Sequence, residues 1–223
     1  MKFYESGDNR KPVIFLFPGT CCLYSSFDHV LDGLHSYFYT VTVSYDGFDP
    51  NEKTEFYSME DECEKIEQEI RKKYGGRIYL VAKIQSSMVV PFMYKMVHTG
   101  TLPKFMQKKL DKTDGGKKEL YNGFLNMFGI GKGGSPWITK QSIYNQFYSD
   151  LVTKVQRGID VPGTTIHVFY ATKMGEKYEK RYCTYFKNPD IRKHNMQHEE
   201  LFFCHSAEWV EEVRKAVELP DEI

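Results

Sequence analysis

The sequence predicts an α/β fold, in which a mostly parallel sheet is flanked by helices and carries a helical cap insertion. The apolar run Val-Ile-Phe-Leu-Phe at residues 13–17 is typical of a strand buried on both faces of a parallel sheet. Strand-like and helix-like segments alternate through residues 1–90, which implies parallel pairing with right-handed crossovers. Strand character then returns only after a helical stretch. We therefore expect one domain, with residues 1–90 and 159–223 as the two parts of the α/β core and residues 91–158 as the cap.

Composition narrows the class of protein. The 223 residues are 41% hydrophobic and 15% aromatic, which is enough for the core of one domain. Thirty basic and thirty acidic residues are interspersed, which argues against a nucleic-acid interface or a polybasic membrane anchor. No apolar run approaches the roughly 20 residues that span a bilayer, and the start lacks the apolar region of a signal peptide. Five cysteines without framework spacing favour reduced thiols in the cytoplasm.

The elements of the first part follow in order. The sequence Pro-Gly-Thr at residues 18–20 ends the first strand. Residues 27–37 predict a helix with one apolar face, and residues 38–45 predict a second strand. Ser58 is the expected N-cap of the next helix, because acidic residues fill the first turn after it. Residues 77–81 predict a third strand.

The later elements are helical before they return to strand. Short helices are expected at residues 104–110, 119–128 and 140–155. A further strand is expected at residues 165–170, and helices at residues 178–186 and 207–217, the last with Ser206 as its N-cap.

Two segments of the helical region invite a ligand-binding interpretation. The glycine-rich residues 129–134 resemble a phosphate-binding loop but lack a preceding strand and a terminal Lys-Ser/Thr, so a turn between cap helices is the better account. The aromatic residues 143–148 are expected to pack on the sheet or to line an acyl pocket. No residue spacing typical of a metal site is present, and the sequence predicts no metal and no cofactor.

Three sequence features, in this order, resemble the α/β-hydrolase family. Residues 18–20 stand where that family has His-Gly-x after its first central strand. Residues 159–162, Ile-Asp-Val-Pro, lead into a strand as the family's acid-bearing part does. Residues 197–200, Gln-His-Glu-Glu, resemble the family's Gly-His-x-x motif before the last helix. The resemblance covers nearly the whole chain.

The resemblance implies the chemistry of a serine hydrolase. Such a site has a serine on a strained strand-to-helix turn, a histidine base, an acid that orients it and two backbone N–H groups for the oxyanion. By position, His198 would be the general base and the Thr20 N–H an oxyanion donor, with Cys21 beside it on the same binding turn. The neighbouring thiols of Cys21 and Cys22 admit a nucleophilic reading, but packed thiols are the commoner case. The implied substrate is a small acyl compound.

The acid has two interpretations. The family's Gly-x-x-Asp register falls on residues 171–174 and leaves Met174 at the carboxylate position. Glu176, two residues further on, would serve if the loop has an extra turn; otherwise Glu176 is a solvated surface residue.

The nucleophile departs most from the family pattern, because the chain has no G-x-S-x-G turn. A typical elbow laid on residues 81–90 places Ala82 at the first glycine and Ile84 at the serine. An isoleucine cannot attack a carbonyl group, and the crowded neighbours do not suit an elbow that needs small residues. Ser86 and Ser87, at the later glycines, are the displaced candidates, with Ser86 first.

A second interpretation of the missing G-x-S-x-G turn is that the elbow, its helix and the following strand are all absent. On ordinary element lengths these parts take on the order of 35–40 residues. Only a short stretch separates residues 77–81 from the helical region, and residues 83–90 would then begin the cap. We prefer this reading, because it explains both the missing motif and the missing strand.

Three functions follow from these readings. The chain is a hydrolase of small carboxylic esters or thioesters, a non-catalytic relative that binds a ligand or a partner, or a shortened variant with neither property. Because fold resemblance does not assign chemistry, the missing nucleophile weighs against the first.

Overall fold

The computed structural model describes residues 1–75, 78–82 and 90–218, and these form two compact units, Met1–Thr153 and Lys154–Glu218. Within these ranges no helix has the length and apolar character needed to cross a membrane.

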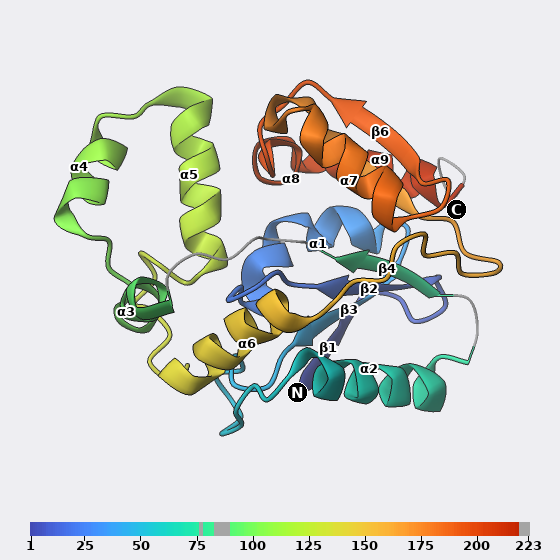
Figure 1. Ribbon diagram of the computed structural model, residues 1–223, viewed down its shortest axis with the longest axis horizontal. Coiled ribbons are helices and arrows are strands. Elements are labelled where there is room, and N and C mark those ends of the chain that lie inside the picture. The colour runs from blue at the N-terminus through green and yellow to red at the C-terminus, as the bar shows by residue number, and fades with distance from the viewer. Residues whose placement is uncertain (76–77, 83–89, 219–223) are drawn as a thin grey trace. The chain divides into compact units, whose positions relative to one another are not determined.

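A four-stranded sheet forms the centre of the first unit. Its strand order is β1-β3-β2-β4, with β2 parallel to both β3 and β4 and β1 antiparallel to β3 (Figure 1). The strands are β1 (Lys2–Ser6), β2 (Val13–Phe17), β3 (Tyr39–Ser44) and β4 (Ile78–Ala82). The mostly parallel α/β sheet predicted from the sequence is therefore confirmed. Strand β1 was not predicted, because its Lys-Phe-Tyr-Glu-Ser sequence is mixed in polarity and lies at a half-buried edge.

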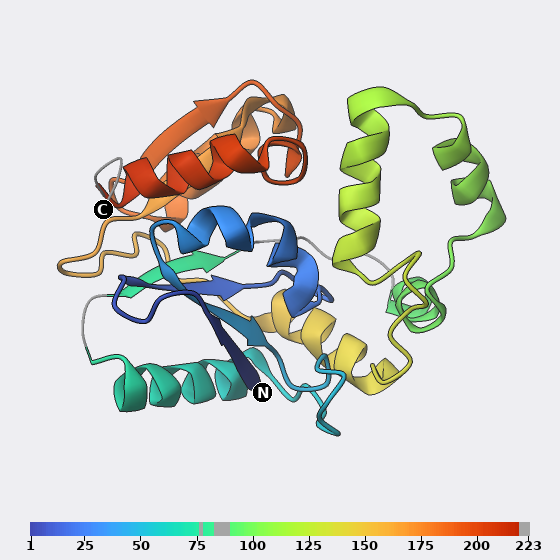
Figure 2. The ribbon, with the colours of Figure 1, turned by 180° about the vertical axis from the view of Figure 1, so that it is seen from behind.

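Helices cover both faces of this sheet. Figures 1 and 2 show α1 (Asp28–His35), which follows the short 3-10 helix η1 (Tyr24–Phe27), on one face and α2 (Met59–Lys73) on the other. The side chains of Ile14, Phe15 and Leu16 on β2 are fully buried, as expected for a central strand. Ser58 is the N-cap of α2, as predicted, because its side chain accepts a hydrogen bond from the Asp61 N–H at 3.2 Å.

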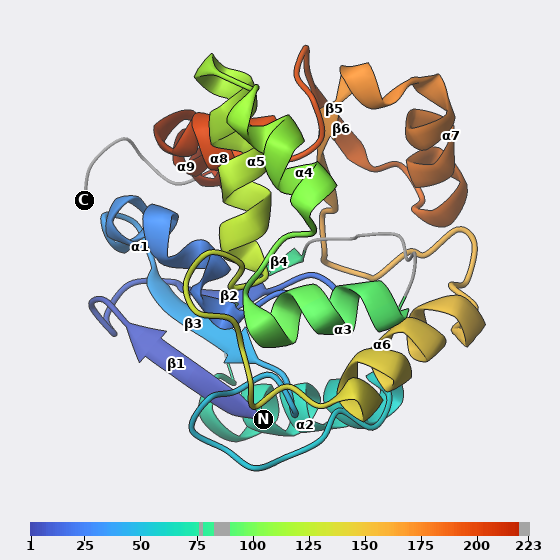
Figure 3. The same cartoon turned by 90° about the vertical axis from the view of Figure 1, so that its left-hand side faces the viewer.

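The region after β4 is helical, as the sequence predicts. It contains α3 (Val90–Thr99), α4 (Lys104–Asp111), α5 (Gly115–Met127) and α6 (Lys140–Val152). Helix α6 packs against α3 and α2 (Figure 3). In the described part of residues 83–166 the only strand-like pairing is an isolated bridge at Ile159.

The glycine-rich loop between α5 and α6 packs against the end of α3. The Gly131 N–H donates to the Gly100 carbonyl at 3.0 Å, and the Ser135 N–H donates to the Val97 carbonyl at 2.8 Å. Gly100 and Gly134 both have positive φ, 65° and 75°, and a Cβ atom built on Gly100 would lie 2.2 Å from the Gly134 nitrogen. The two backbones therefore touch at a point where no side chain fits.

The second unit is a small α/β module. Strands β5 (His167–Ala171) and β6 (Asp190–His194) pair in parallel. The remaining elements are the 3-10 helix η2 (Thr172–Met174) and the helices α7 (Glu176–Tyr185), α8 (Glu200–Cys204) and α9 (Ser206–Ala216). Strand β6 was missed because its sequence, Asp-Ile-Arg-Lys-His, is mostly charged and no residue in it is fully buried.

The predicted N-cap of the last helix is wrong. Ser206 is the first residue of α9, His205 occupies the N-cap position, and no side chain caps the helix end. The apolar face is as expected, since Trp209, Val210 and Val213 are buried. That face, rather than a cap, supplies the tertiary packing that holds the helix.

Candidate functional site

The carboxyl ends of β2 and β3 lie at the same edge of the first sheet, because the two strands are parallel. In open α/β sheets this edge is where ligands bind. Two loops leave it, one starting at Pro18 and one at Tyr45. The predicted binding turn at Thr20 and Cys21 belongs to the first of these loops.

The turn after β2 is strained and buried. Cys21 has a φ of 59°, in the left-handed region that residues other than glycine rarely adopt, and its side chain is fully buried. Its N–H donates to the Gln146 Oε1 at 2.7 Å, and Gln146 is itself 2% exposed. The hydrogen bond to α6 therefore stabilises a backbone conformation that is unfavourable for a cysteine residue.

A second hydrogen bond from the same turn reaches α6. The Thr20 Oγ1 donates to the Asp150 Oδ2 at 2.6 Å. Desolvation raises the pKa of Asp150, and the Thr20 hydroxyl offsets part of that rise. This bond orients the Thr20 residue, whose N–H the family resemblance implies as an oxyanion donor.

One polar stripe on α6 holds both loops. Ser142, Gln146 and Asp150 recur every four residues and so share one side of the helix. The Ser142 Oγ accepts the Phe56 N–H at 3.2 Å in the loop after β3, while Gln146 and Asp150 bind the loop after β2. Sequence reasoning missed these residues. The available signal was three polar side chains at helical spacing in a helix that also carries buried apolar residues such as Ile143.

The thiol of Cys21 is not suited to nucleophilic attack. Burial raises the pKa of this thiol well above its ordinary value, with smaller contributions from Cys22 and Asp150. The thiolate is the reactive form of cysteine, so a thiol held protonated at neutral pH is inert. The geometry favours the packed-thiol reading of the Cys21-Cys22 pair.

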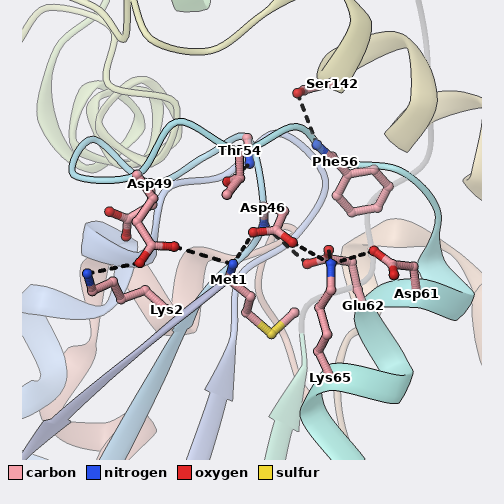
Figure 4. A network of polar contacts seen from close by, with 12 residues as sticks. Met1, Lys2, Asp46, Asp49, Thr54, Phe56, Asp61, Glu62, Lys65 and Ser142 are labelled. Carbon is pink, nitrogen blue, oxygen red and sulfur yellow. Dashed lines mark hydrogen bonds and ion pairs between the residues drawn. The ribbon is translucent and has the colours of Figure 1, made fainter.

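A cluster of charges lies where β3 ends (Figure 4). Carboxylate oxygens of Asp46, Asp61 and Glu62 lie within 4.8 Å of one another. Such an arrangement could bind a metal ion. The Lys65 Nζ lies 2.5 Å from the Asp61 Oδ2, and both Lys65 and the Met1 ammonium group contact Asp46. Burial raises the pKa of Asp46, but these two cations outweigh burial and leave it below its ordinary value. Two protein cations therefore already offset the charges of Asp46 and Asp61.

Glu62 in this cluster makes stability depend on pH. Its side chain is fully buried and accepts the Asp46 N–H at 3.2 Å, and burial raises its pKa from 4.5 to about 7. The folded state therefore binds this proton more tightly than the unfolded state, so stability falls as pH rises from about 4.5 to above 7. Glu62→Gln keeps an acceptor for the Asp46 N–H and removes the titration.

The free energy of unfolding of the unaltered protein is compared with that of Glu62→Gln at each pH. We expect the difference to shift against the unaltered protein by at most about 3 kcal/mol as the pH rises through this range. Urea denaturation at several pH values measures it. Glu64→Gln, at an exposed position on the same helix, is the control and should leave the pH profile unchanged. Parallel profiles for the unaltered protein and Glu62→Gln would contradict the assignment.

In the second unit, His198 lies in the loop between β6 and α8. Its Nε2 is 3.8 Å from the Glu199 Oε1, and their side chains are 38% and 13% exposed. Glu199 has a φ of 61°. His194, at the end of β6, packs edge-on against Phe169 with ring centroids 6.1 Å apart. The arrangement offers His198 a neighbouring carboxylate and access to solvent.

Glu176 lies elsewhere in the second unit. It is the exposed first residue of α7, directly after Gly175, whose φ is 94°. Among the residues that the structure describes, Glu176 has no hydrogen bond or ion pair to His198. The carboxylate that does lie near His198 is that of Glu199, which was not predicted as a site residue.

Ser86, Ser87 and Ile84 lie outside the described residues, and the elbow and cap-helix readings of residues 83–90 therefore both stay predictions.

Comparisons with known proteins identify the fold as that of the α/β-hydrolases. An α/β-hydrolase family protein from Desulfitobacterium hafniense matches with a TM-score of 0.64 and 12% identity over 97% of this chain and 100% of that chain. An esterase from a marine microorganism matches with a TM-score of 0.59 and 15% identity over 96% of this chain and 98% of that chain. No protein-family model and no curated protein matches the sequence.

The same fold is shared with a protein of different chemistry. A 1H-3-hydroxy-4-oxoquinoline 2,4-dioxygenase matches with a TM-score of 0.60 and 13% identity over 97% of this chain and 95% of that chain. Identities this low show the fold alone, and the fold by itself does not select the reaction.

Proposed function

We propose that this protein hydrolyses small carboxylic esters or thioesters at the carboxyl edge of its first sheet. The observation that carries the proposal is the turn after β2, in which Cys21 is strained and the Gln146 and Asp150 side chains bind the Cys21 N–H and the Thr20 hydroxyl. Strained backbone held by surrounding contacts is characteristic of binding and catalytic sites. Solved structures with this fold include an esterase and an enol-lactonase.

The proposed reaction takes Ser86 as a displaced nucleophile, which is the alternative to an absent elbow, and it assigns one step to each residue. By the family resemblance, the Ser86 hydroxyl would attack the carbonyl carbon while His198 takes its proton, and the Thr20 N–H would stabilise the oxyanion that forms. His198 then returns the proton to the leaving alcohol or thiol, and water hydrolyses the acyl-enzyme. The helices α3 to α6 would act as the cap over the substrate.

Covalent labelling tests this proposal. A fluorophosphonate probe is expected to modify the purified protein at Ser86, and Ser86→Ala is expected to abolish the adduct while Ser87→Ala retains it. Peptide mapping by mass spectrometry locates the adduct. Modification at another serine would overturn the assignment of Ser86.

The acid of the site can be assigned by a matched pair of variants. We expect Glu199→Gln to lower the labelling rate by about 10-fold or more, because a carboxylate near the imidazole stabilises the cation that forms. Glu176→Gln is expected to leave the rate nearly unchanged, since Glu176 is exposed and not bonded to His198. The reverse ranking would restore Glu176 as the acid.

A second candidate function is ligand binding without catalysis. The observation that favours it is in the sequence: Ala82, Ile84 and Ser86 stand at positions of the elbow where the hydrolase pattern has glycine, serine and glycine. On this account the turn at Thr20 binds a small acyl compound and nothing attacks it. Absence of both labelling and turnover of nitrophenyl esters, together with saturable binding of an acyl compound, would favour this function.

The cellular location belongs to the same proposal. All five cysteines are free thiols, two of them exposed, which fits a reducing compartment such as the cytoplasm.

A further inference from the structure

A groove unrelated to the turn at Thr20 lies between α6 and the segment that leads into α2. Its volume is about 490 Å³. We name it the tyrosine groove; its lining residues are Glu55, Tyr57, Ser58, Glu60, Gln141, Tyr144, Asn145, Tyr148, Ser149 and Val152. All of these belong to the first unit. The volume lies in the range of small-molecule sites.

Three tyrosine rings stand open to solvent in this groove. Tyr57 is 75% exposed, Tyr144 50% and Tyr148 53%. The Tyr144 and Tyr148 rings are one helical turn apart and stack, with centroids 6.0 Å apart and an interplanar angle of 11°. The sequence predicts that this aromatic segment packs on the sheet or lines an acyl pocket. Only one face of α6 does pack inward, since Ile143 and Phe147 are buried.

The charge of the groove is negative. Glu55 and Glu60 are exposed, and no ion pair of the described chain involves either of them; Glu55 accepts only a hydroxyl hydrogen bond from Thr139, at 3.4 Å. No Lys, Arg or His is among the described residues that line it. The positive end of α2 at Ser58 contributes only about half a charge, which the two carboxylates outweigh.

Aromatic faces and uncompensated carboxylates attract the same kind of ligand. An organic cation gains from the electron-rich face of a tyrosine ring and from the opposite charge of a carboxylate. We propose that the tyrosine groove binds an organic ammonium ion, with its alkyl groups on the Tyr144 and Tyr148 rings and its charge near Glu60. This site is independent of the proposed ester hydrolysis and does not require it.

Titration with tetramethylammonium chloride, followed by NMR of ring-labelled tyrosine, tests the proposal. The Tyr144 and Tyr148 signals, identified with Tyr144→Phe and Tyr148→Phe, are expected to shift and to saturate. tert-Butanol has a similar size and no charge, and is expected to bind about threefold to fivefold more weakly. Sodium chloride at the same concentration controls for ionic strength.

Matched variants locate the site. Tyr148→Ala and Glu60→Gln are each expected to weaken binding of tetramethylammonium by about threefold or more. Leu151→Ala, at an exposed position of α6 outside the groove, and Glu64→Gln, at an exposed position of α2, are expected to bind as the unaltered protein does. All four positions are exposed, and circular dichroism checks that each variant is folded.

Three results would overturn the inference. These are equal affinity for tert-butanol, equal weakening by the control variants, and no saturable shift of the two tyrosines. Labelling of Ser86 by the fluorophosphonate probe is unaffected by any of them, so failure of this inference and failure of the proposed hydrolysis are separable.

Discussion

Replacing His198 with alanine is expected to lower the rate of covalent labelling, and kcat/KM for short-chain nitrophenyl esters, by about 10²–10⁴-fold. The reason is that a serine hydroxyl is a weak nucleophile until a neighbouring base takes its proton. His198 lies in the loop before α8 and is partly exposed to solvent. Its Nε2 lies 3.8 Å from the Glu199 Oε1. The rate of probe addition, followed by fluorescence after gel electrophoresis, measures the effect.

The control for this variant is His205→Ala. His205 is exposed and precedes α9, and its side chain does not cap that helix. We expect His205→Ala to label at the rate of the unaltered protein, and the His198→Ala melting temperature to change little. Equal labelling by His198→Ala and the unaltered protein would remove His198 from the mechanism and leave the turn at Thr20 as a binding feature only.

Replacing Gly134 with alanine is expected to lower the free energy of unfolding by about 3 kcal/mol, since a left-handed residue with a side chain costs about 1–2 kcal/mol and overpacking adds about 1–3 kcal/mol. A Cβ atom on Gly134 would lie 2.3 Å from the Gly100 nitrogen and 2.6 Å from the Thr99 carbonyl carbon, and both are backbone atoms. Neither can move as a flexible side chain would. Urea denaturation measures the change.

A glycine in the same helical region provides the comparison. Gly116 lies in the first turn of α5, where an added Cβ atom would meet nothing within 4 Å. Gly116→Ala is expected to leave stability unchanged or to raise it by up to about 1 kcal/mol. If Gly134→Ala were as stable as Gly116→Ala, the close contact between Gly100 and Gly134 would not exist in solution.

The fold followed from local patterns where those patterns were strong. The central strand β2 was predictable because its five residues are apolar and continuous, and α2 because Ser58 and three acidic residues mark its start. Strands β1 and β6 were not predictable in the same way. Both are half-buried and carry charged residues, so backbone pairing with a neighbouring strand, rather than hydrophobic periodicity, defines them.

The site was predictable only in part. The Pro-Gly-Thr turn drew attention to Thr20 and Cys21, but nothing near them in the sequence pointed to Gln146 and Asp150, more than 100 residues later in the chain. The glycine-rich residues 129–134 show a second limit. The sequence predicted a turn between helices, and they do lie between α5 and α6, but only the structure shows that they pack against α3.

The sequence by itself determined the parallel α/β class, the helical region after β4 and the position of the turn after β2, because each of these depends on patterns within a few neighbouring residues. The tertiary structure alone decided which side chains hold that turn, which carboxylates lie near His198 and Glu62, and which tyrosines remain exposed. Those properties depend on contacts between distant segments, on burial and on the direction of each side chain. None of these is set by the spacing of residues along the chain.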